Sequence, residues 1–239
     1  MCWAVSKQKQ NKIYQQKSRR DVRQRAIQFI GWRSSIPLHP SAVLRVPLRN
    51  SLTMIQKSFN KLETYIRKEN HKGYDPYDTL NSWKPFHWFG KWGPILAIQI
   101  QKRNPVNVRP LIGIKKEINP KAYGLFLQTY SMLYQHTKKQ EYLDQAQYFY
   151  TWLKDKHSKG HCGKGWGYNF PWASREKYLK KHVPSAVVTG FVAKGLYEYY
   201  QITKSKEVFE LLKDAGNFVL TELPVTSFDE GVCLSLIHI

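Results

Sequence analysis

An internal repeat constrains the fold of this 239-residue chain more than any other feature of its sequence. Pairs of identical residues stand 66 positions apart: Gly124 and Gly190, Tyr134 and Tyr200, Gln135 and Gln201, Thr137 and Thr203, Lys138 and Lys204, Glu141 and Glu207. Each copy has the pattern of a helix, a tight turn over 136–140 or 202–206, and a second helix. Antiparallel helical hairpins of this size bury their apolar faces only against neighbouring hairpins. The repeat therefore predicts stacked hairpins, in a solenoid or in a closed α/α ring.

Hydrophobic periodicity predicts the individual helices. They are expected over about 52–70, 88–101, 120–137, 141–157, 184–202 and 206–223. Asn119 is a good N-cap and Pro120 suits a first helical position, so this start is the clearest. No stretch alternates apolar and polar residues long enough to predict a sheet. The long, aromatic connections between hairpins favour the ring, so we expect an all-α protein whose antiparallel hairpins form part of an (α/α)6 toroid.

The formal net charge of +21 is unevenly distributed along the chain. Residues 1–50 hold eleven Lys or Arg against Asp21 alone, which leaves +11 for the other 189 residues. This pattern predicts a basic, poorly ordered extension over 1–50, the part of the chain best suited to nucleic acid or another acidic surface. A partial toroid domain is expected over 51–231. The abrupt apolar run over 232–239 resembles a non-native tail that interrupts a longer natural chain.

Cysteine usage and hydrophobicity indicate a compartment. Cys2, Cys162 and Cys233 form no close pair, so no disulfide framework is predicted. The N-terminus lacks the apolar core of a secretory signal, and no apolar run is long enough to span a bilayer. A cytoplasmic location is the expectation. No phosphate-cradling glycine motif and no serine or cysteine nucleophile setting is present, so no cofactor is predicted.

The first candidate site is the segment Tyr74-Asp75-Pro76-Tyr77-Asp78. Asp75 and Asp78 are candidate catalytic acid/base groups, because two carboxyl groups flanked by aromatic rings suit work on sugar hydroxyls and glycosidic bonds. Tyr74 and Tyr77 are candidate substrate contacts. The structural alternative is a turn at Asp75, with Asp78 capping the residues that follow.

The second candidate site is the glycine- and aromatic-rich loop over 165–175. Its glycines would let the backbone present flat rings on which the CH face of a sugar stacks. The candidate substrate-binding residues of this loop are Trp166, Tyr168, Asn169, Trp172 and Arg175. A loop pinned to the helices by its aromatic residues is the alternative.

Two weaker patterns complete the candidates. Arg109, between an apolar loop and a proline, suits a carboxylate or phosphate group but serves loop carbonyls equally well. His157, His161 and Cys162 form one ligand cluster without a partner elsewhere, so no metal site is predicted.

These motifs occur in an order that resembles a known family. The order is Tyr74–Leu80, then Asn107–Leu111, then Asn119–Ala122 with Gly124–Phe126, then Gly165–Arg175, then Pro184–Thr189. It resembles the six-hairpin, glycosidase-like proteins found with bacterial and archaeal surface-polysaccharide biosynthesis, over about residues 55–231. The resemblance implies an α/α toroid and a carbohydrate context, and no catalytic residue is carried over from it.

We therefore expect a carbohydrate-active protein that acts on a polysaccharide or its precursor in biosynthesis or processing, in the manner of a glycoside hydrolase or another carbohydrate-active enzyme. The alternative is a non-catalytic glycan-binding or assembly protein that uses the same aromatic cleft. An isoprenoid-handling toroid would need an acid-rich diphosphate site or a convincing zinc set, and the sequence has neither. Nucleic-acid binding is expected only from the basic extension.

Overall fold

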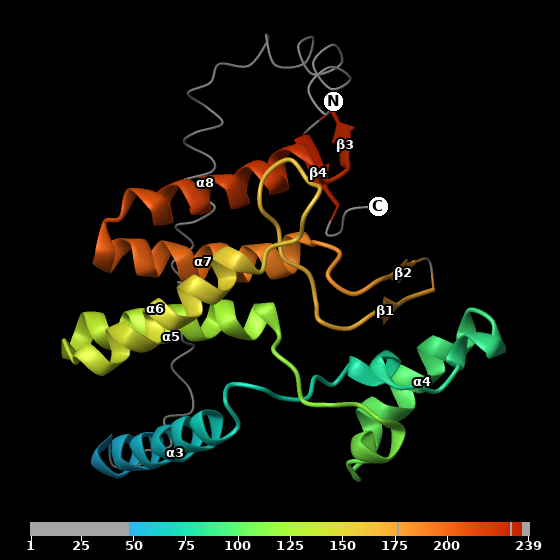
Figure 1. Ribbon diagram of the computed structural model, residues 1–239, viewed down its shortest axis with the longest axis horizontal. Helices are drawn as coiled ribbons and strands as arrows, with labels where there is room; N and C mark the ends of the chain where they lie inside the picture. The colour runs from blue at the N-terminus through green and yellow to red at the C-terminus, as the bar shows by residue number, and fades with distance from the viewer. Residues whose placement is uncertain (1–47, 176, 230, 236–239) are drawn as a thin grey trace, which may run out of the picture. The chain divides into compact units, whose positions relative to one another are not determined.

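The computed structural model describes residues 48–175, 177–229 and 231–235. The chain divides into two units, Met1–Glu63 and Thr64–Ile239. The helix α3 (Leu48–Lys68) crosses this division, and all later elements belong to the second unit (Figure 1). The predicted extension over 1–50 lies, apart from its last residues, outside the described part of the chain. The candidate site lies wholly within the second unit.

Most of the described chain is helical, which confirms the all-α expectation. After the end of α3, the described residues of the second unit form three short 3₁₀ helices, five longer α-helices and two small β-hairpins. Its elements are η1 (Asp78–Asn81), η2 (Phe86–Phe89), α4 (Trp92–Arg103), η3 (Arg109–Ile112), α5 (Pro120–Thr137), α6 (Gln140–Asp155), β1 (Trp172–Ala173), β2 (Tyr178–Leu179), α7 (Ala186–Thr203), α8 (Lys206–Thr221), β3 (Val225–Phe228) and β4 (Gly231–Leu234).

The helix bounds confirm the repeat. Both ends of α7 lie 66 positions after those of α5, and both ends of α8 lie 66 positions after those of α6. The two hairpins also turn in the same way. Lys138 and Lys204 adopt the left-handed conformation, with φ of 57° and 52°, and close α5 and α7 as C-caps. The sequence identity at this offset is therefore an identity of local structure.

Side-chain caps fix where the first helix of each hairpin begins. The Asn119 side chain accepts a hydrogen bond from the backbone N–H of Lys121 (3.0 Å), as the sequence predicts. Ser185 plays the same part for α7 and accepts from the backbone N–H of Val188 (3.3 Å). The two capped starts face the loops, so both helix N-termini lie near the candidate site residues.

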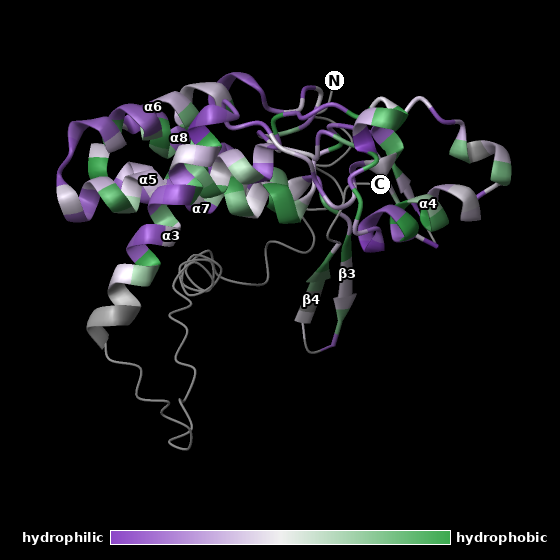
Figure 2. Ribbon diagram, turned by 90° about the horizontal axis from the view of Figure 1, so that it is seen from below, coloured by the Kyte–Doolittle hydropathy of each residue, from purple (hydrophilic) through white to green (hydrophobic). Residues whose placement is uncertain are grey.

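The core lies between the two hairpins. In Figure 1, α5 packs against both α6 and α7, and α7 packs against α8. Figure 2 shows that these helices carry hydrophobic and hydrophilic residues on different faces. Within the first hairpin, the fully buried rings of Tyr123 on α5 and Phe149 on α6 meet edge to face, with centroids 4.9 Å apart. Gly124 and Gly195 allow the backbones of α5 and α7 to approach closely.

Two short β-hairpins depart from the expectation that the chain has no strands. β1 pairs with β2 and β3 pairs with β4, each antiparallel. The first hairpin sets Trp172 opposite Leu179. Strands of two to four residues are too short for the alternation of apolar and polar residues to be recognised in the sequence. The second hairpin includes part of the segment over 232–239 that was predicted to be non-native.

None of the helices in the described part of the chain has the length and hydrophobicity that crossing a bilayer requires.

Candidate functional site

A cavity of about 580 Å³ brings the two main sequence motifs together. We call it the aromatic cavity. The residues that line it are Asp75, Pro76, Tyr77, Lys121, Tyr168, Phe170, Trp172, Leu179, Lys180, Val183, Ser185 and Val187. The first three come from the segment before η1, and most of the others come from the loop between α6 and α7. Its volume falls in the range of small-molecule sites.

Close glycine packing positions the long loop. A Cβ on Gly165 would lie 2.8 Å from the Pro184 Cβ, and a Cβ on Gly167 would lie 2.1 Å from the Val183 carbonyl oxygen. A larger residue at Gly165 would collide with the Pro184 and Phe218 side chains, and one at Gly167 would collide with the backbone of Val183. The glycines therefore press the loop against the start of α7, and do not free a ring for a ligand.

Trp166 corrects one sequence prediction. Its side chain is fully buried, and its indole N–H donates to the Leu153 carbonyl oxygen (3.0 Å). Its backbone N–H donates to the Thr189 hydroxyl (3.1 Å). A ring held in this way cannot stack on a sugar. Trp166 belongs to the core and anchors the loop, which was the alternative interpretation of this segment.

The remaining rings of the loop form the wall of the cavity. Tyr168 stacks on Phe170 with centroids 5.0 Å apart, and the antiparallel β1–β2 pairing holds Trp172. Burial raises the pKa of the Tyr168 phenol, and the nearby Asp75 and Tyr77 raise it further. The phenol is therefore a hydrogen-bond donor at neutral pH. Tyr168 and Trp172, two of the predicted substrate contacts, both line this cavity.

Asp75 is the carboxylate of this cavity. Its Oδ1 accepts from the Tyr77 backbone N–H (3.0 Å), and its Oδ2 accepts from the Asn119 side chain (3.1 Å). Burial raises the pKa of the Asp75 carboxyl, and the nearby Asp78 carboxylate raises it further, while the hydrogen bond from Tyr77 opposes the shift. A held carboxyl group with a raised pKa can retain a proton for transfer.

Asp78 and Arg109, predicted separately, form an ion pair. The Arg109 Nε lies 2.8 Å from the Asp78 Oδ1, and the side chains are only 14% and 4% exposed. The Asp78 Oδ2 accepts from the Asp75 backbone N–H (3.0 Å), and Arg109 donates to the Asp75 carbonyl oxygen (3.0 Å). Both side chains are thus committed to the backbone that carries Asp75. This geometry favours a positioning role for both, over acid/base work or anion binding.

The two tyrosines of the same segment lie differently. The Tyr77 hydroxyl accepts from the Lys102 ammonium group (2.6 Å), and its ring lines the aromatic cavity. Tyr74 has the Arg109 guanidinium 5.4 Å and the Lys116 ammonium 5.8 Å from its ring centroid. The Lys102 ammonium group also lies 4.7 Å from the Tyr77 ring centroid, so both rings lie beside cations, and Tyr77 differs from Tyr74 in lining the aromatic cavity.

Asn169 and Arg175 lie outside the aromatic cavity. Asn169 is buried, and its side-chain N–H donates to Glu117 (3.1 Å). Arg175 is exposed between β1 and β2. Two cations that the sequence did not single out take the place of the predicted arginines. Lys121 and Lys180 both line the cavity, and Lys121 follows the capped start of α5 directly.

The histidine and cysteine cluster is spread over a different surface. His157 contacts the Lys154 carbonyl oxygen (3.1 Å), while His161 lies 3.3 Å from Glu222 and Cys162 is exposed. Over residues 48–175, 177–229 and 231–235, no three His, Cys, Asp or Glu side chains gather as a metal site would require.

No protein-family model matches the chain. No curated protein sequence matches it either. The functional interpretation therefore depends on the cavity and its residues.

Proposed function

We propose that this protein handles an acidic carbohydrate, which it binds in the aromatic cavity. The observation that carries the proposal is the composition of the cavity wall. Four aromatic side chains, Tyr77, Tyr168, Phe170 and Trp172, line the same cavity as one carboxyl group and two lysines. Rings suit the apolar faces of sugars, and hydrogen-bonding groups suit their hydroxyls.

Charge in the cavity favours an anionic sugar. Lys121 and Lys180 line the cavity, and Asp75 is its only carboxylate among the lining residues. Because the pKa of Asp75 is raised, its negative charge is partly suppressed towards acidic pH. A uronate or a phosphorylated sugar would complement the lysines.

Calorimetric titration tests this function with acidic and neutral oligosaccharides. We expect saturable binding that is stronger for the acidic ligands and weakens as salt is added. Trp172→Ala should weaken it at least about tenfold. Trp88→Ala is the matched control, since Trp88 is exposed and lies outside the cavity lining. Equal loss in both variants, or no binding by the unaltered chain, would contradict the proposal.

A reaction on the bound glycan would use Asp75 as its proton donor. Asp75→Asn should then abolish turnover while leaving most of the binding affinity. The second candidate is glycan binding without catalysis, as in an assembly protein. One observation favours it: hydrolysis needs two carboxyl groups across the cleft, and among the described residues that line the cavity Asp75 alone carries one. Binding without turnover in the unaltered chain would establish this second function.

We also propose that the hairpins belong to a closed α/α toroid of the six-hairpin, glycosidase-like type. The support is the repeat itself. Tyr150 on α6 is buried and stacks on Tyr199, but its counterpart on α8, Gly216, is exposed. Lys154 pairs with Glu207 at 2.5 Å, whereas its counterpart, Leu220, is 50% exposed. On α6 this face is covered by the next hairpin, α7–α8. The equivalent face of α8 is exposed, as expected for a surface on which a further hairpin would pack.

A further inference from the structure

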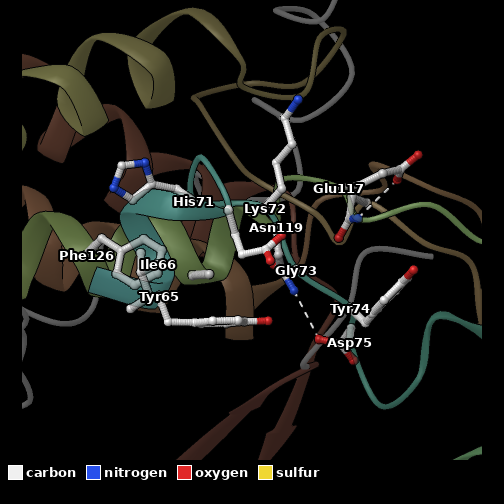
Figure 3. Close-up of a pocket in the computed structure, with 13 residues that line it drawn as sticks. Tyr65, Ile66, His71, Lys72, Gly73, Tyr74, Asp75, Glu117, Asn119 and Phe126 are labelled. Carbon is white, nitrogen blue, oxygen red and sulfur yellow. Dashed lines mark hydrogen bonds between the residues drawn. The ribbon is translucent and has the colours of Figure 1, made fainter. Parts of the chain in front are cut away.

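A second, smaller cavity of about 220 Å³ lies on the other side of Asp75. We call it the polar cavity. Its lining residues are Tyr65, Ile66, Glu69, His71, Lys72, Gly73, Tyr74, Asp75, Glu117, Asn119, Ala122, Phe126 and Asn169 (Figure 3). Its wall contains three carboxyl groups, a histidine and two side-chain amides. Its lining also includes the rings of Tyr65, Tyr74 and Phe126, and it differs from the aromatic cavity in having three carboxyl groups where the lining of that cavity has one.

The end of α3 and the start of α5 build this cavity. Gly73 and Glu117 exchange two backbone hydrogen bonds of 3.1 Å, which tie the two chain segments together. The Glu69 carboxylate pairs with Lys116 (2.6 Å). The Glu117 carboxylate accepts from Asn169 (3.1 Å). Most of the polar groups are thus held in place by their neighbours before any ligand arrives.

Two buried polar atoms of the lining residues remain unpaired. Within the described part of the chain, the Asn169 Oδ1 and the His71 Nε2 have no hydrogen-bond partner. Asn169 is only 7% exposed, and the bond from its amide nitrogen to Glu117 fixes which end is oxygen. A buried acceptor without a donor is costly, and such an atom calls for an explanation. Both atoms are fully buried, so a ligand in the cavity does not reach them, and they mark the tight packing of its wall.

Asp75 lines both cavities. Its Oδ1 is bonded to the backbone of Tyr77, which lines the aromatic cavity. Its Oδ2 is bonded to Asn119, which lines the polar cavity (Figure 3). The carboxyl group thus stands between a space for stacked rings and a space for hydroxyl groups.

We propose that the polar cavity is a second sugar subsite, which holds one terminal monosaccharide of the glycan. The rest of the glycan lies in the aromatic cavity, and the linkage between the two parts passes Asp75. This inference rests on the proposed function. The small volume limits the polar cavity to a single ring, and the Glu117 carboxylate, which Asn169 holds in place, selects that ring by its hydroxyl groups.

The test measures binding of the full chain to an array of acidic oligosaccharides. The oligosaccharides are arranged in pairs, and the shorter member of each pair lacks one terminal sugar. The unaltered chain should prefer the longer member of a pair. Asn169→Leu should bind the longer member about tenfold more weakly and lose the preference. Asn217→Leu is the control, because Asn217 is exposed on α8. Glu117→Gln is a second variant, which keeps the side-chain shape, and it should also reduce the preference.

The outcomes separate this inference from the proposed function. If Trp172→Ala loses binding while Asn169→Leu and Glu117→Gln keep the full preference, the second subsite is overturned and the aromatic cavity stands. If the unaltered chain binds no glycan on the array, the proposed function fails and the subsite with it. Melting curves of both variants, matched to those of the unaltered chain, ensure that a loss of binding reflects the cavity.

Discussion

Gly124 in α5 and Gly195 in α7 bring two helix backbones into direct contact. A Cβ on Gly195 would lie 2.3 Å from the Gly124 carbonyl oxygen, and a Cβ on Gly124 would lie 2.9 Å from the Val192 backbone. Backbone atoms cannot move aside as a flexible side chain can. The distance between the two hairpins is therefore set by the absence of side chains at these two positions.

Gly195→Ala should accordingly destabilise the protein by about 1–3 kcal/mol, through forced separation of α5 and α7. Gly190→Ala on the same helix should do the opposite. Gly190 is exposed, and an added Cβ meets nothing within 4 Å, so the better helix propensity of alanine should stabilise by about 0.5–1 kcal/mol. Urea unfolding followed by circular dichroism measures both. Equal effects at the two positions would contradict the packing argument.

Trp166→Ala and Trp172→Ala should have different effects, because Trp166 belongs to the core and Trp172 to the cavity wall. Loss of the fully buried Trp166 should cost about 3–5 kcal/mol of unfolding free energy. Trp172 is half-buried at the cavity wall, so its removal should act on glycan affinity with a smaller effect on stability. Paired unfolding and binding measurements decide this. If the Trp166 variant were as stable as the unaltered chain but no longer bound glycan, the result would support the original prediction that Trp166 stacks on a sugar.

Arg109→Ala should destabilise the protein by about 3–5 kcal/mol, because it leaves the Asp78 carboxylate buried without its partner. Asp78→Asn combined with Arg109→Ala should recover part of the loss, since the buried charge is then removed as well. Arg103→Ala is the control, because Arg103 is exposed at the end of α4. Thermal unfolding of the unaltered chain, of Arg109→Ala, of Asp78→Asn and of the double variant gives the coupling. Additive losses in the double variant would show that the ion pair is not formed.

The histidine of the polar cavity should make stability depend on pH. Burial lowers the pKa of His71 below its ordinary value of 6.5, and the Arg67 charge lowers it further. The unfolded chain then binds a proton more readily, so stability should be lost as pH falls from 6.5 towards the lowered pKa. His71→Phe should reduce this loss, because a ring at this position still packs edge to face on Phe149. His136→Phe, at an exposed position, should leave the slope unchanged.

Asp75 should give the opposite slope at lower pH. Because its pKa is raised in the folded protein, stability should fall as pH rises from the ordinary value of 3.8 to the raised one. Asp75→Asn should remove this slope. The variant also sets an amide N–H against that of Asn119, a cost that does not depend on pH. The raised pKa of Asp75 is tested by measuring the unfolding free energy of both proteins between pH 3 and pH 7 and comparing the slopes. Parallel curves would contradict it.

Local signals predicted the helices well. Asn119 and Pro120 mark the start of α5 in the sequence, and the shared Thr-Lys pair before each turn marks where α5 and α7 end. Such signals lie within a few residues of the structure that they specify, so a single sequence reveals them. Closure into a ring depends on contacts between distant hairpins, and it stays a prediction.

The site was predicted less evenly. Asp75, Tyr77, Tyr168 and Trp172 were chosen from two separate motifs and line one cavity. Trp166 was misjudged because glycines beside a tryptophan fit a buried ring as well as a displayed one. Lys121 and Lys180 carry no distinguishing pattern, since exposed lysines are common throughout the chain. Only the fold brings them to the same wall.

The repeated helices and the ligand contacts are encoded in different stretches of the chain. The helix bounds keep their 66-residue offset, while most of the aromatic wall comes from the single loop between α6 and α7. Beyond its anchor at Trp166, this loop can change in length and chemistry without disturbing the hairpin core. Such a division lets ligand preference diverge between descendants of one ancestor while the scaffold stays the same.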